Sequence, residues 1–302
     1  MSDRQTKDIE YLSLIAEYRI ITTDMLAFLA ESKLRTTQHR IKNLTGKKFI
    51  TLSPHLGNAS RGKPSNLISL SYAGIEAIAD ILEKDDKDPF YRIMNQNIYH
   101  IDHELLTNVF RLHLLQLARH NREFTTDFIS PKSPFLSCRK NGLPEISEQV
   151  TVNGSTRTFI PDGVCSIYST KEKNRLLFFL ESDRANESIR GASESGTLTT
   201  KLENYHAYLT SGEYKRYDKY WNCSFSGFRL LFLCDDTSKM KKLARFVAQY
   251  PTLDYVWITD TENLVTKGIG ERIWLRGGNT SISAQSILGH GNVCTLPPVI
   301  TI

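Results

Sequence analysis

Two acidic residues inside otherwise apolar strand segments constrain the fold of this chain most. Residues 158–168 and 175–182 are rich in β-branched and aromatic residues, and the polar run 169–174 between them has the composition of a turn. The sequence therefore predicts a β-hairpin whose turn places Asp162 opposite Glu181. Directly opposed residues share one face with Cβ atoms about 4.5–5.5 Å apart, and two carboxylates so close repel unless a cation or a proton lies between them. This arrangement predicts a site for a divalent metal ion.

Each acidic motif also has a simpler interpretation. Asp162 could cap a turn with Gly163, and residues 181–184 (Glu-Ser-Asp-Arg) could be the polar end of a strand in which the arginine neutralises its neighbours. Either motif alone favours that interpretation. Together, opposed across a hairpin of Phe, Leu and Ile, the two carboxylates favour a functional site, because buried carboxylates need a partner.

Composition sets outer limits on the fold and the function. The 302 residues, 40% of them hydrophobic, suit two modest domains, and the net charge of +5 only weakly indicates a polyanionic partner. The five cysteines are scattered without CxxC spacing, which argues against a disulfide framework or a zinc site and favours a reducing cytoplasm. No signal-like leader and no run of about 18 apolar residues occurs, so neither secretion nor a membrane span is expected.

Residues 1–84 predict a winged-helix domain, which consists of three helices followed by a hairpin. The predicted elements are helices over 8–16, 24–30 (capped by Thr22 or Thr23) and 36–44 (opened by Thr36 or Thr37), strands over 49–52 and 66–70, and a further helix over 72–82.

This domain carries a one-signed stretch of charge, because no acid occurs between Ser32 and Ile75. Its basic residues are Lys33, Arg35, Arg40, Lys42, Lys47, Lys48, Arg61 and Lys63. A winged helix inserts its third helix into the major groove, which would expose some of Arg35, Thr37, Gln38, Arg40 and Lys42 to double-stranded DNA. Arg61 and Lys63, in the hairpin loop, could contact phosphate or the minor groove. The alternatives are a solvated basic surface and a protein-docking module.

The charged run 85–88 predicts a linker to a second domain at 89–302. A helix over 102–120 opens this domain, with Glu104, Asn108 and Arg111 on one polar stripe. The stripe could face the acids of the hairpin, although a solvated face is the favoured interpretation for Asn108 and Arg111. His103 and His113 are expected to pack or to lie at the surface, because no second ligand has metal-binding spacing from either.

The rest of the chain predicts an α/β domain with a mixed sheet covered on both faces. The expected elements are a helix over 199–209, a strand over 228–234, a helix over 239–249, and strands over 255–259 and 272–275. On the first helix, Lys201, Tyr205 and Tyr208 follow i, i+4, i+7 spacing and share one side. Residues 279–302 could form an ordered cap or a loose tail.

The order of these motifs resembles the replication-relaxation family over nearly the whole chain. The motifs are the winged helix, a helix that opens with His103-Glu104-Leu105, then Pro161-Asp162-Gly163, then residues 181–184 with Glu187, and then residues 201–205 (Lys-Leu-Glu-Asn-Tyr). This family occurs on plasmids and integrative elements. Its C-terminal domain is related to the PD-(D/E)xK nuclease fold, and its layout is similar to that of MobC-type relaxases.

The resemblance implies roles for individual residues. Asp162 and Glu181 match the metal-binding acids of active nucleases with this fold, and Glu104 matches the carboxylate on the first helix. The expected Glu-x-Lys pattern reads Glu-x-Asp here, with Asp183 in place of the lysine. Asp183 could be a further ligand of Mg²⁺ or Mn²⁺, with Lys201 supplying the missing positive charge.

Two classes of function remain open from the sequence. The first is a metal-dependent, relaxase-like enzyme that nicks DNA at an origin of transfer or replication. The second is a non-catalytic DNA-binding regulator of replication, mobilisation or transcription, in which the nuclease-like domain serves for dimerisation or for docking of other mobilisation or replication proteins. A covalent tyrosine mechanism is a weaker third possibility, because Tyr205, Tyr208, Tyr214, Tyr217 and Tyr220 crowd one region without a histidine triad; such clusters are more often core.

Overall fold

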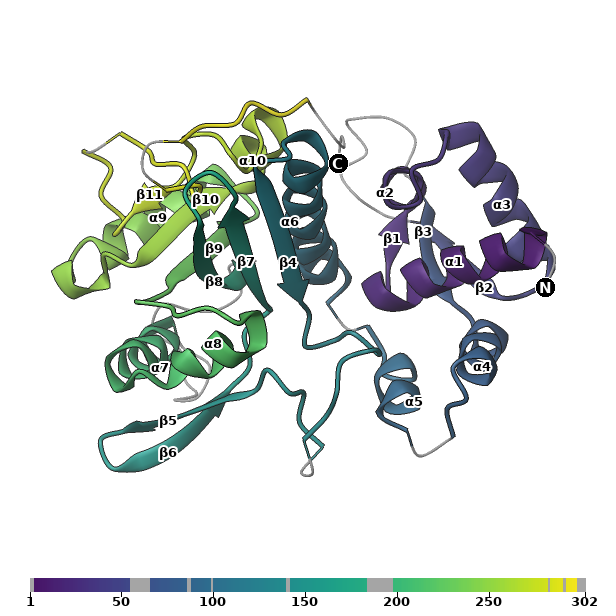
Figure 1. The fold of residues 1–302 in the computed structure, drawn as a ribbon, viewed down its shortest axis with the longest axis horizontal. Coiled ribbons are helices and arrows are strands. Elements are labelled where there is room, and N and C mark those ends of the chain that lie inside the picture. The colour runs from purple at the N-terminus through teal and green to yellow at the C-terminus, as the bar shows by residue number, and fades with distance from the viewer. Residues whose placement is uncertain are drawn as a thin grey trace. The chain divides into compact units, whose positions relative to one another are not determined.

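The computed structural model describes residues 3–54, 66–85, 88–98, 100–139, 142–183, 198–281, 283–289 and 292–297. It combines helices with mixed sheets, which confirms the predicted α/β class (Figure 1). Within these described ranges, no helix is both long enough and apolar enough to cross a bilayer.

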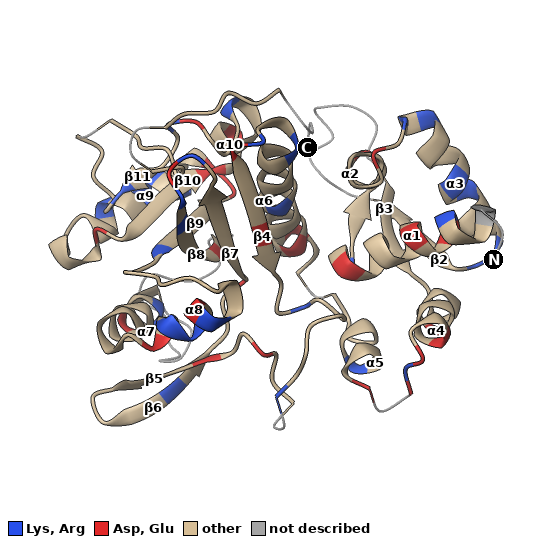
Figure 2. Ribbon diagram, viewed as in Figure 1, with Lys and Arg blue, Asp and Glu red and all other residues tan. Residues whose placement is uncertain are grey.

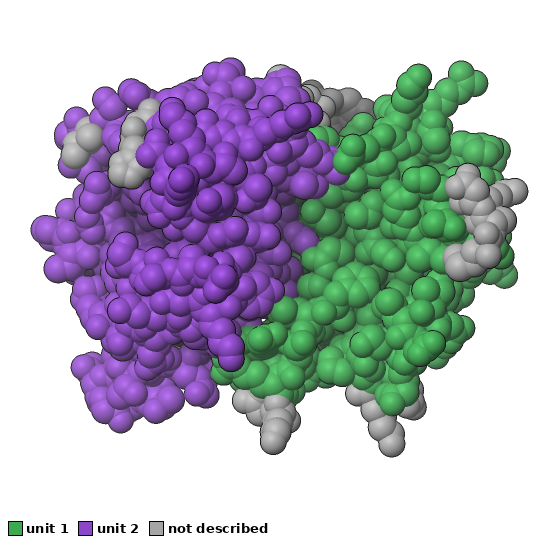
Figure 3. Space-filling view, viewed as in Figure 1, with its two compact units in different colours: residues 1–108, 132–145, 302 green, residues 109–131, 146–301 purple. Residues whose placement is uncertain are grey.

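The chain divides into two compact units, residues 1–108 with 132–145 and residues 109–131 with 146–301 (Figure 3). The sequence predicts a second domain from residue 89 onwards, whereas residues 89–108 and 132–145 group with the N-terminal helices. The domain limits 1–84 and 89–302 therefore stay a prediction.

The first unit begins with the order of elements that the winged-helix interpretation predicts. Its elements are α1 (Asp3–Tyr18), β1 (Ile21–Thr22), α2 (Thr23–Leu29), α3 (Leu34–Gly46), β2 (Ile50–Pro54), β3 (Asn66–Leu70), α4 (Tyr72–Ile81), α5 (Pro89–Met94) and the start of α6 (Ile101–His120). The three strands form an antiparallel sheet in the order β1-β3-β2. Ile15 of α1, Leu26 of α2 and Leu44 of α3 are completely buried and form the core of this unit.

The predicted start of the second helix is confirmed, and that of the third is wrong. The Met25 backbone N–H donates to Thr22 Oγ1 at 3.3 Å, so Thr22 is the N-cap of α2. In contrast, α3 begins at Leu34, ahead of both candidate caps. Thr37 is completely buried and its hydroxyl lies 3.2 Å from the Tyr11 hydroxyl of α1. A tertiary contact therefore uses the side chain that the sequence assigns to capping and to DNA exposure.

The second unit is built on a six-stranded mixed sheet. Its elements are the rest of α6, β4 (Phe124–Ile129), β5 (Glu148–Val152), β6 (Ser155–Phe159), β7 (Gly163–Ser169), β8 (Asn174–Asp183), α7 (Leu198–Ser211), α8 (Arg216–Trp221), β9 (Arg229–Cys234), α9 (Thr237–Val247), β10 (Val256–Asp260), α10 (Thr261–Lys267) and β11 (Leu275–Arg276). The strand order is β11-β10-β9-β8-β7-β4, with β8, β9 and β10 parallel to one another and the other pairs antiparallel. The predicted mixed sheet is confirmed.

Helices cover both faces of this sheet. The Phe179 ring of β8 packs against Tyr205 of α7 and Tyr217 of α8, at centroid distances of 5.8 and 5.7 Å. Phe128 of β4 points to the other face, because it pairs with Cys165 whereas Phe179 pairs with the adjacent Val164. There Phe128 packs 6.2 Å from Phe110 of α6.

The predicted strand 158–168 is two strands that belong to different sheets. β6 pairs with β5 in a separate two-stranded hairpin, and β7 enters the main sheet. Residues 160–162 separate them, and Pro161 at their centre has no N–H to continue a ladder. Gly163, which starts β7, fits because a Cβ there would lie 2.1 Å from the Phe128 ring. The Pro-Asp-Gly motif therefore marks the point where the chain changes sheets.

The segment after residue 279 packs as an ordered cap over its described part. Ile287 is completely buried, Leu296 is 6% exposed, and the Ser286 hydroxyl donates to the Gly270 carbonyl at 2.9 Å. Gln285 and Trp274 exchange two backbone hydrogen bonds, in which the N–H of each residue donates to the carbonyl of the other. Of the two interpretations of this segment, the described residues 283–289 and 292–297 favour the ordered cap.

Candidate functional site

The register of the β7–β8 hairpin places the two predicted acids side by side. Gly163 pairs with Leu180, so Asp162, one residue earlier, lies opposite Glu181. The Asp162 backbone N–H donates to the Leu180 carbonyl at 3.0 Å, and Asp162 Oδ2 accepts the Ser182 N–H at 2.8 Å. The predicted opposition of the two carboxyl groups is confirmed. Asp162 also bridges the strands, which a simple turn cap with Gly163 would not do.

The Glu181 carboxylate is buried and held from helix α7. Its side chain is only 6% exposed; Lys201 Nζ donates to Oε2 at 3.0 Å and the Tyr205 hydroxyl donates to Oε1 at 2.6 Å. Burial raises the pKa of the Glu181 carboxyl above its ordinary value; Lys201 opposes this shift, and the neighbouring Asp162 carboxylate adds to it. The predicted i, i+4 pairing of Lys201 and Tyr205 on one side of the helix is confirmed, and this side faces Glu181.

Two further acids were predicted to join this site. Asp183 ends β8 and pairs with Cys234 of β9 in the ladder, but its side chain lies outside the described residues. Glu104 belongs to the first unit, where its carboxylate forms an ion pair with Lys132. The metal-binding roles of Asp183 and Glu104 stay predictions.

The described residues present oxygen donors that fit Mg²⁺ or Mn²⁺. No group of three or more His, Cys, Asp or Glu side chains that could hold a metal occurs in the described part of the chain. Mg²⁺ commonly binds through only one or two protein carboxylates, with water and substrate phosphates completing its coordination. Each carboxylate oxygen has two lone pairs, so the bonds from Lys201 and Tyr205 leave acceptor sites on Glu181. Asp162 and Glu181 are therefore chemically suited to hold such an ion.

A second buried acid in the same unit was not predicted. Glu148, at the start of β5, is 1% exposed; its carboxylate accepts from the Tyr208 hydroxyl at 2.5 Å and from the Tyr217 hydroxyl at 2.7 Å, and lies 3.5 Å from Arg216 Nη1. Tyr208 is the third residue of the predicted α7 side, so this helix binds two acids. No local motif surrounds Glu148, and its tyrosine partners lie 60 and 69 residues later, so no short-range signal identifies it.

The aromatic cluster is core, which confirms the preferred interpretation. Tyr205, Tyr208, Tyr214 and Tyr217 are each at most 5% exposed, whereas Tyr220 is 52% exposed. Burial, with the neighbouring acids next, raises the pKa of the Tyr205, Tyr208 and Tyr217 hydroxyls well above their ordinary value. A nucleophile needs a lowered pKa or an adjacent base, so these environments disfavour a covalent tyrosine mechanism.

The solvated face predicted for the polar stripe of α6 is wrong. Asn108 is 2% exposed and its amide donates to the carbonyls of Tyr18 and Ile20 at 3.0 and 2.8 Å. Arg111 is also buried, with its guanidinium 5.1 Å from the Phe128 ring centroid. The predicted packing role of His113 is confirmed: it is 1% exposed, and burial lowers its pKa to about 4.

A buried aspartate of the first unit neutralises part of its basic surface. Lys33, Arg35, Gln38, Lys42, Lys47 and Lys48 are exposed on α3 and at its ends, where Figure 2 shows several Lys and Arg residues along the helix. However, Arg40 and Lys47 form ion pairs with the buried Asp8 of α1, at 2.5 and 2.6 Å. Arg61 and Lys63 lie outside the described residues. Four of the predicted basic contacts, Lys33, Arg35, Lys42 and Lys48, are thus exposed and take no part in the ion pairs with Asp8.

The chain matches the model of a known protein family. The model of a family described as replication-relaxation matches residues 12–222, which is more than half of the chain and includes α3, Asp162, Glu181 and Lys201. Neither the curated proteins nor the solved structures contained a match.

Proposed function

Because the chain belongs to the replication-relaxation family, we propose that it is a DNA-nicking protein of a plasmid or an integrative element. Membership of this family suggests a role in the replication or mobilisation of such elements. In this proposal, α3 of the winged helix binds double-stranded DNA in the cytoplasm, and the Asp162–Glu181 pair cuts one strand at an origin of transfer or replication.

One observation carries the enzymatic part of the proposal. Lys201 Nζ lies 3.0 Å from Oε2 of Glu181, the acid that is opposed to Asp162. This lysine comes from a helix and not from the strand position that the Glu-x-Lys pattern assigns to it. The site therefore has two carboxylates and one cation, which is the set of groups that the pattern requires. The site keeps these three groups although Asp183 occupies the position of the lysine in the pattern.

The chain's own residues have distinct roles in strand hydrolysis. Mg²⁺ or Mn²⁺, held by Asp162 and Glu181, would supply positive charge at the scissile phosphate and lower the pKa of a bound water. Lys201 would orient that water or the phosphate through its ammonium group. Tyr205, which donates to Glu181, fixes the carboxylate. Glu181 itself is buried, so its charge acts in a region of lower dielectric constant than that of bulk water.

A plasmid assay combined with calorimetry tests the site. We expect Asp162→Asn and Glu181→Gln to abolish Mg²⁺- or Mn²⁺-dependent nicking of supercoiled DNA from the protein's own element, and to weaken ion binding measured by titration calorimetry. Duplex affinity should be unchanged in both variants. Wild-type nicking rates in either variant would refute the assignment of the site.

The exposed part of α3 is tested by the salt dependence of duplex binding. Each phosphate contact contributes a slope of about −0.9 to a plot of log affinity against log salt concentration. Arg35→Ala with Lys42→Ala should therefore weaken binding and flatten that slope by about 2. Lys84→Ala is the matched control, because Lys84 lies outside the acid-free stretch and pairs with Asp88 at the surface. An unchanged slope in the double variant would favour a protein-docking role for α3.

A non-catalytic regulator is the second candidate, and one observation favours it. Both oxygens of Glu181 already accept hydrogen bonds from Lys201 and Tyr205, so the acid has partners without any metal. If wild type binds duplex DNA but neither binds the ions nor nicks, the chain is a regulator built on a nuclease-like scaffold.

A further inference from the structure

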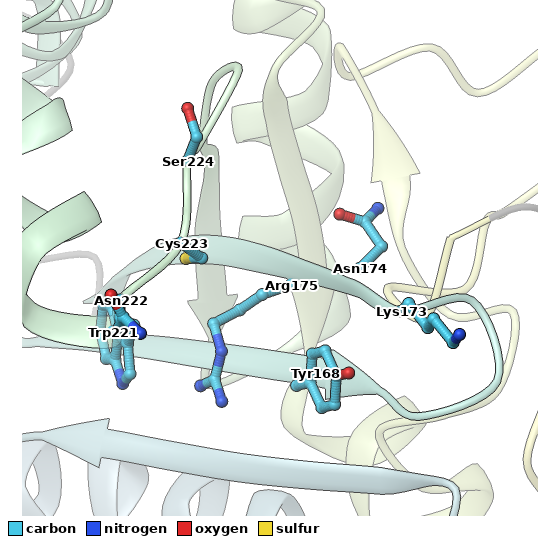
Figure 4. A pocket seen from close by; sticks show the side chains of 8 residues that line it. All are labelled: Tyr168, Lys173, Asn174, Arg175, Trp221, Asn222, Cys223 and Ser224. Carbon is cyan, nitrogen blue, oxygen red and sulfur yellow. The ribbon is translucent and has the colours of Figure 1, made fainter.

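A pocket of about 380 Å³ lies at the turn end of the β7–β8 hairpin, the end opposite to Asp162 and Glu181 (Figure 4). Two aromatic side chains, Tyr168 and Trp221, line it together with two basic ones, Lys173 and Arg175. Asn174, Asn222, Cys223 and Ser224 also line it. None of the described residues that line the pocket is acidic.

The Arg175 side chain is fixed in place. Its guanidinium donates to Asp127 Oδ2 at 2.6 Å and to Ser166 Oγ at 2.5 Å, and it lies 5.4 Å from the Tyr168 ring centroid. In Figure 4 this side chain extends between Trp221 and Tyr168. Asp127 offsets part of the arginine charge, so Lys173, which is exposed, supplies the remaining positive charge of the pocket.

The Trp221 ring is held from behind by the aromatic core. It stacks on Tyr217 with centroids 5.6 Å apart and an interplanar angle of 26°, and Phe225 meets it edge to face at 6.0 Å. The ring is partly exposed and lines the pocket, so it offers a preformed surface for stacking. Because the ring is already held in place, it loses little conformational entropy when a planar ligand stacks on it, which favours binding.

The pocket and the carboxylate site share one face of the sheet. Tyr168 pairs with Arg175 and Gly163 with Leu180, so Arg175, Leu177, Phe179 and Glu181 alternate onto the same face of β8. Glu181 follows Arg175 by six positions, a distance of about 20 Å along the strand. Leu177 and Phe179 between them are buried, and α7 and α8 cover Phe179, so a DNA strand that reaches both places would pass over these helices and not along the sheet.

We propose that this pocket binds a nucleotide of single-stranded DNA, whose base stacks on Trp221 and whose phosphate pairs with Lys173 and Arg175. Aromatic platforms combined with basic side chains are the recurrent means of binding single strands without reading their sequence. The inference rests on the proposed function, because a nicked strand that separates from its partner is the ligand. The pocket would hold that strand about 20 Å from the cut.

Tryptophan fluorescence tests this pocket directly. The chain has three tryptophans, and Trp257 and Trp274 are 5% and 0% exposed, so Trp221 is the tryptophan that a ligand can reach. A ten-residue oligothymidylate should quench the tryptophan emission of wild type, and Trp221→Phe should abolish the quenching. Quenching that persists unchanged in Trp221→Phe would overturn the assignment.

Matched lysine variants test the phosphate contact. Lys171 and Lys173 lie in the same turn and both are exposed, but only Lys173 lines the pocket. By fluorescence anisotropy, Lys173→Glu should weaken binding of the labelled oligothymidylate at least about fivefold, whereas Lys171→Glu should stay near wild type. Equal losses in the two variants would assign the effect to general charge and overturn the pocket.

Two further experiments complete the test. The first distinguishes a free nucleotide from single-stranded DNA as the ligand, and the second distinguishes failure of the pocket from failure of the proposed function. If thymidine monophosphate binds as tightly as the oligonucleotide, the pocket belongs to a free nucleotide and the single-strand assignment is wrong. Asp162→Asn should lose nicking and keep the quenching. Nicking without quenching in wild type overturns only the pocket, and quenching without nicking overturns only the proposed function.

Discussion

Two buried glutamates of the second unit, Glu148 and Glu181, have similar partners but different surroundings. Both accept hydrogen bonds from tyrosines of α7, Tyr208 for Glu148 and Tyr205 for Glu181. Glu148 has a second tyrosine and an arginine, whereas Glu181 has Lys201 and an opposed carboxylate, Asp162.

These surroundings suggest a role in stability for Glu148 and a role in binding a ligand for Glu181. A second carboxylate beside Glu181 raises its pKa further and makes an added cation favourable, whereas the partners of Glu148 donate hydrogen bonds or carry positive charge. We therefore infer that Glu148 connects the β5–β6 hairpin to α7 and α8, and that Glu181 is the acid with spare capacity for a ligand.

Stability should respond most strongly at Glu148. Removing one partner of a buried ion pair costs about 3–5 kcal/mol, because the other groups are left buried. We expect Glu148→Ala to lower the free energy of unfolding by that amount in urea denaturation. Glu181→Ala should cost less, because it also removes the repulsion with Asp162.

An exposed ion pair at the same junction provides the control for that measurement. Glu203 of α7 pairs with Arg157 of β6 at 3.0 Å, and its side chain is 48% exposed. Glu203→Ala should change the free energy of unfolding by less than about 1 kcal/mol. Equal costs for Glu148→Ala and Glu181→Ala would remove the distinction between the two buried acids.

Nicking should show the reverse order. Glu181→Gln preserves the shape of the side chain but removes its charge, and we expect a fall in nicking rate of about 10²-fold or more. Glu148→Gln should leave the rate per folded molecule near that of wild type. A supercoiled-plasmid assay on samples matched for circular dichroism makes the comparison, and a similar loss in both variants would make Glu148 part of the site.

The two tyrosines of α7 sharpen the comparison further. Tyr208→Phe removes a hydrogen bond to a charged group and should lower the free energy of unfolding by about 1.5–3 kcal/mol without changing the pH profile of nicking. Tyr205→Phe should move the rise of nicking to higher pH, because the bond from Tyr205 lowers the pKa of Glu181. Rate measurements across pH decide this, and identical profiles for wild type and Tyr205→Phe would contradict the role of Tyr205.

The smallest expected effect is the pH dependence of stability. The pKa of Glu181 is raised by burial above its ordinary 4.5, so the folded state holds this proton more tightly than the unfolded state. Its contribution to stability is thus complete below pH 4.5 and is lost as the pH rises through the folded-state pKa, by at most about 1.4 kcal/mol per pH unit. Glu181→Gln should lack this loss in urea titrations, and parallel curves for the two proteins would contradict the raised pKa.

Local sequence patterns were sufficient to predict contacts between residues on one side of a helix or across a short hairpin. The turn at 169–174 fixed the register that brings Asp162 to Glu181, and helical spacing put Lys201 and Tyr205 on one side of α7. They failed where a residue's partner comes from distant sequence. The Thr37 hydroxyl contacts that of Tyr11, and the Asn108 amide donates to the carbonyls of Tyr18 and Ile20, about ninety residues earlier.

The sequence alone determined the α/β class, the three helices and the hairpin of the N-terminal segment, the acid-free basic stretch and the opposed pair of acids, because these depend on periodicity, turn chemistry and composition. Tertiary structure alone decided which of those groups are engaged. In the fold, Asp8 forms ion pairs with Arg40 and Lys47, and Glu148 contacts three residues of α7 and α8. Tyr168, Arg175 and Trp221 line one pocket. The physical reason is that charge and hydrogen-bond partners are chosen by distance in space, which the fold sets only after the elements have packed.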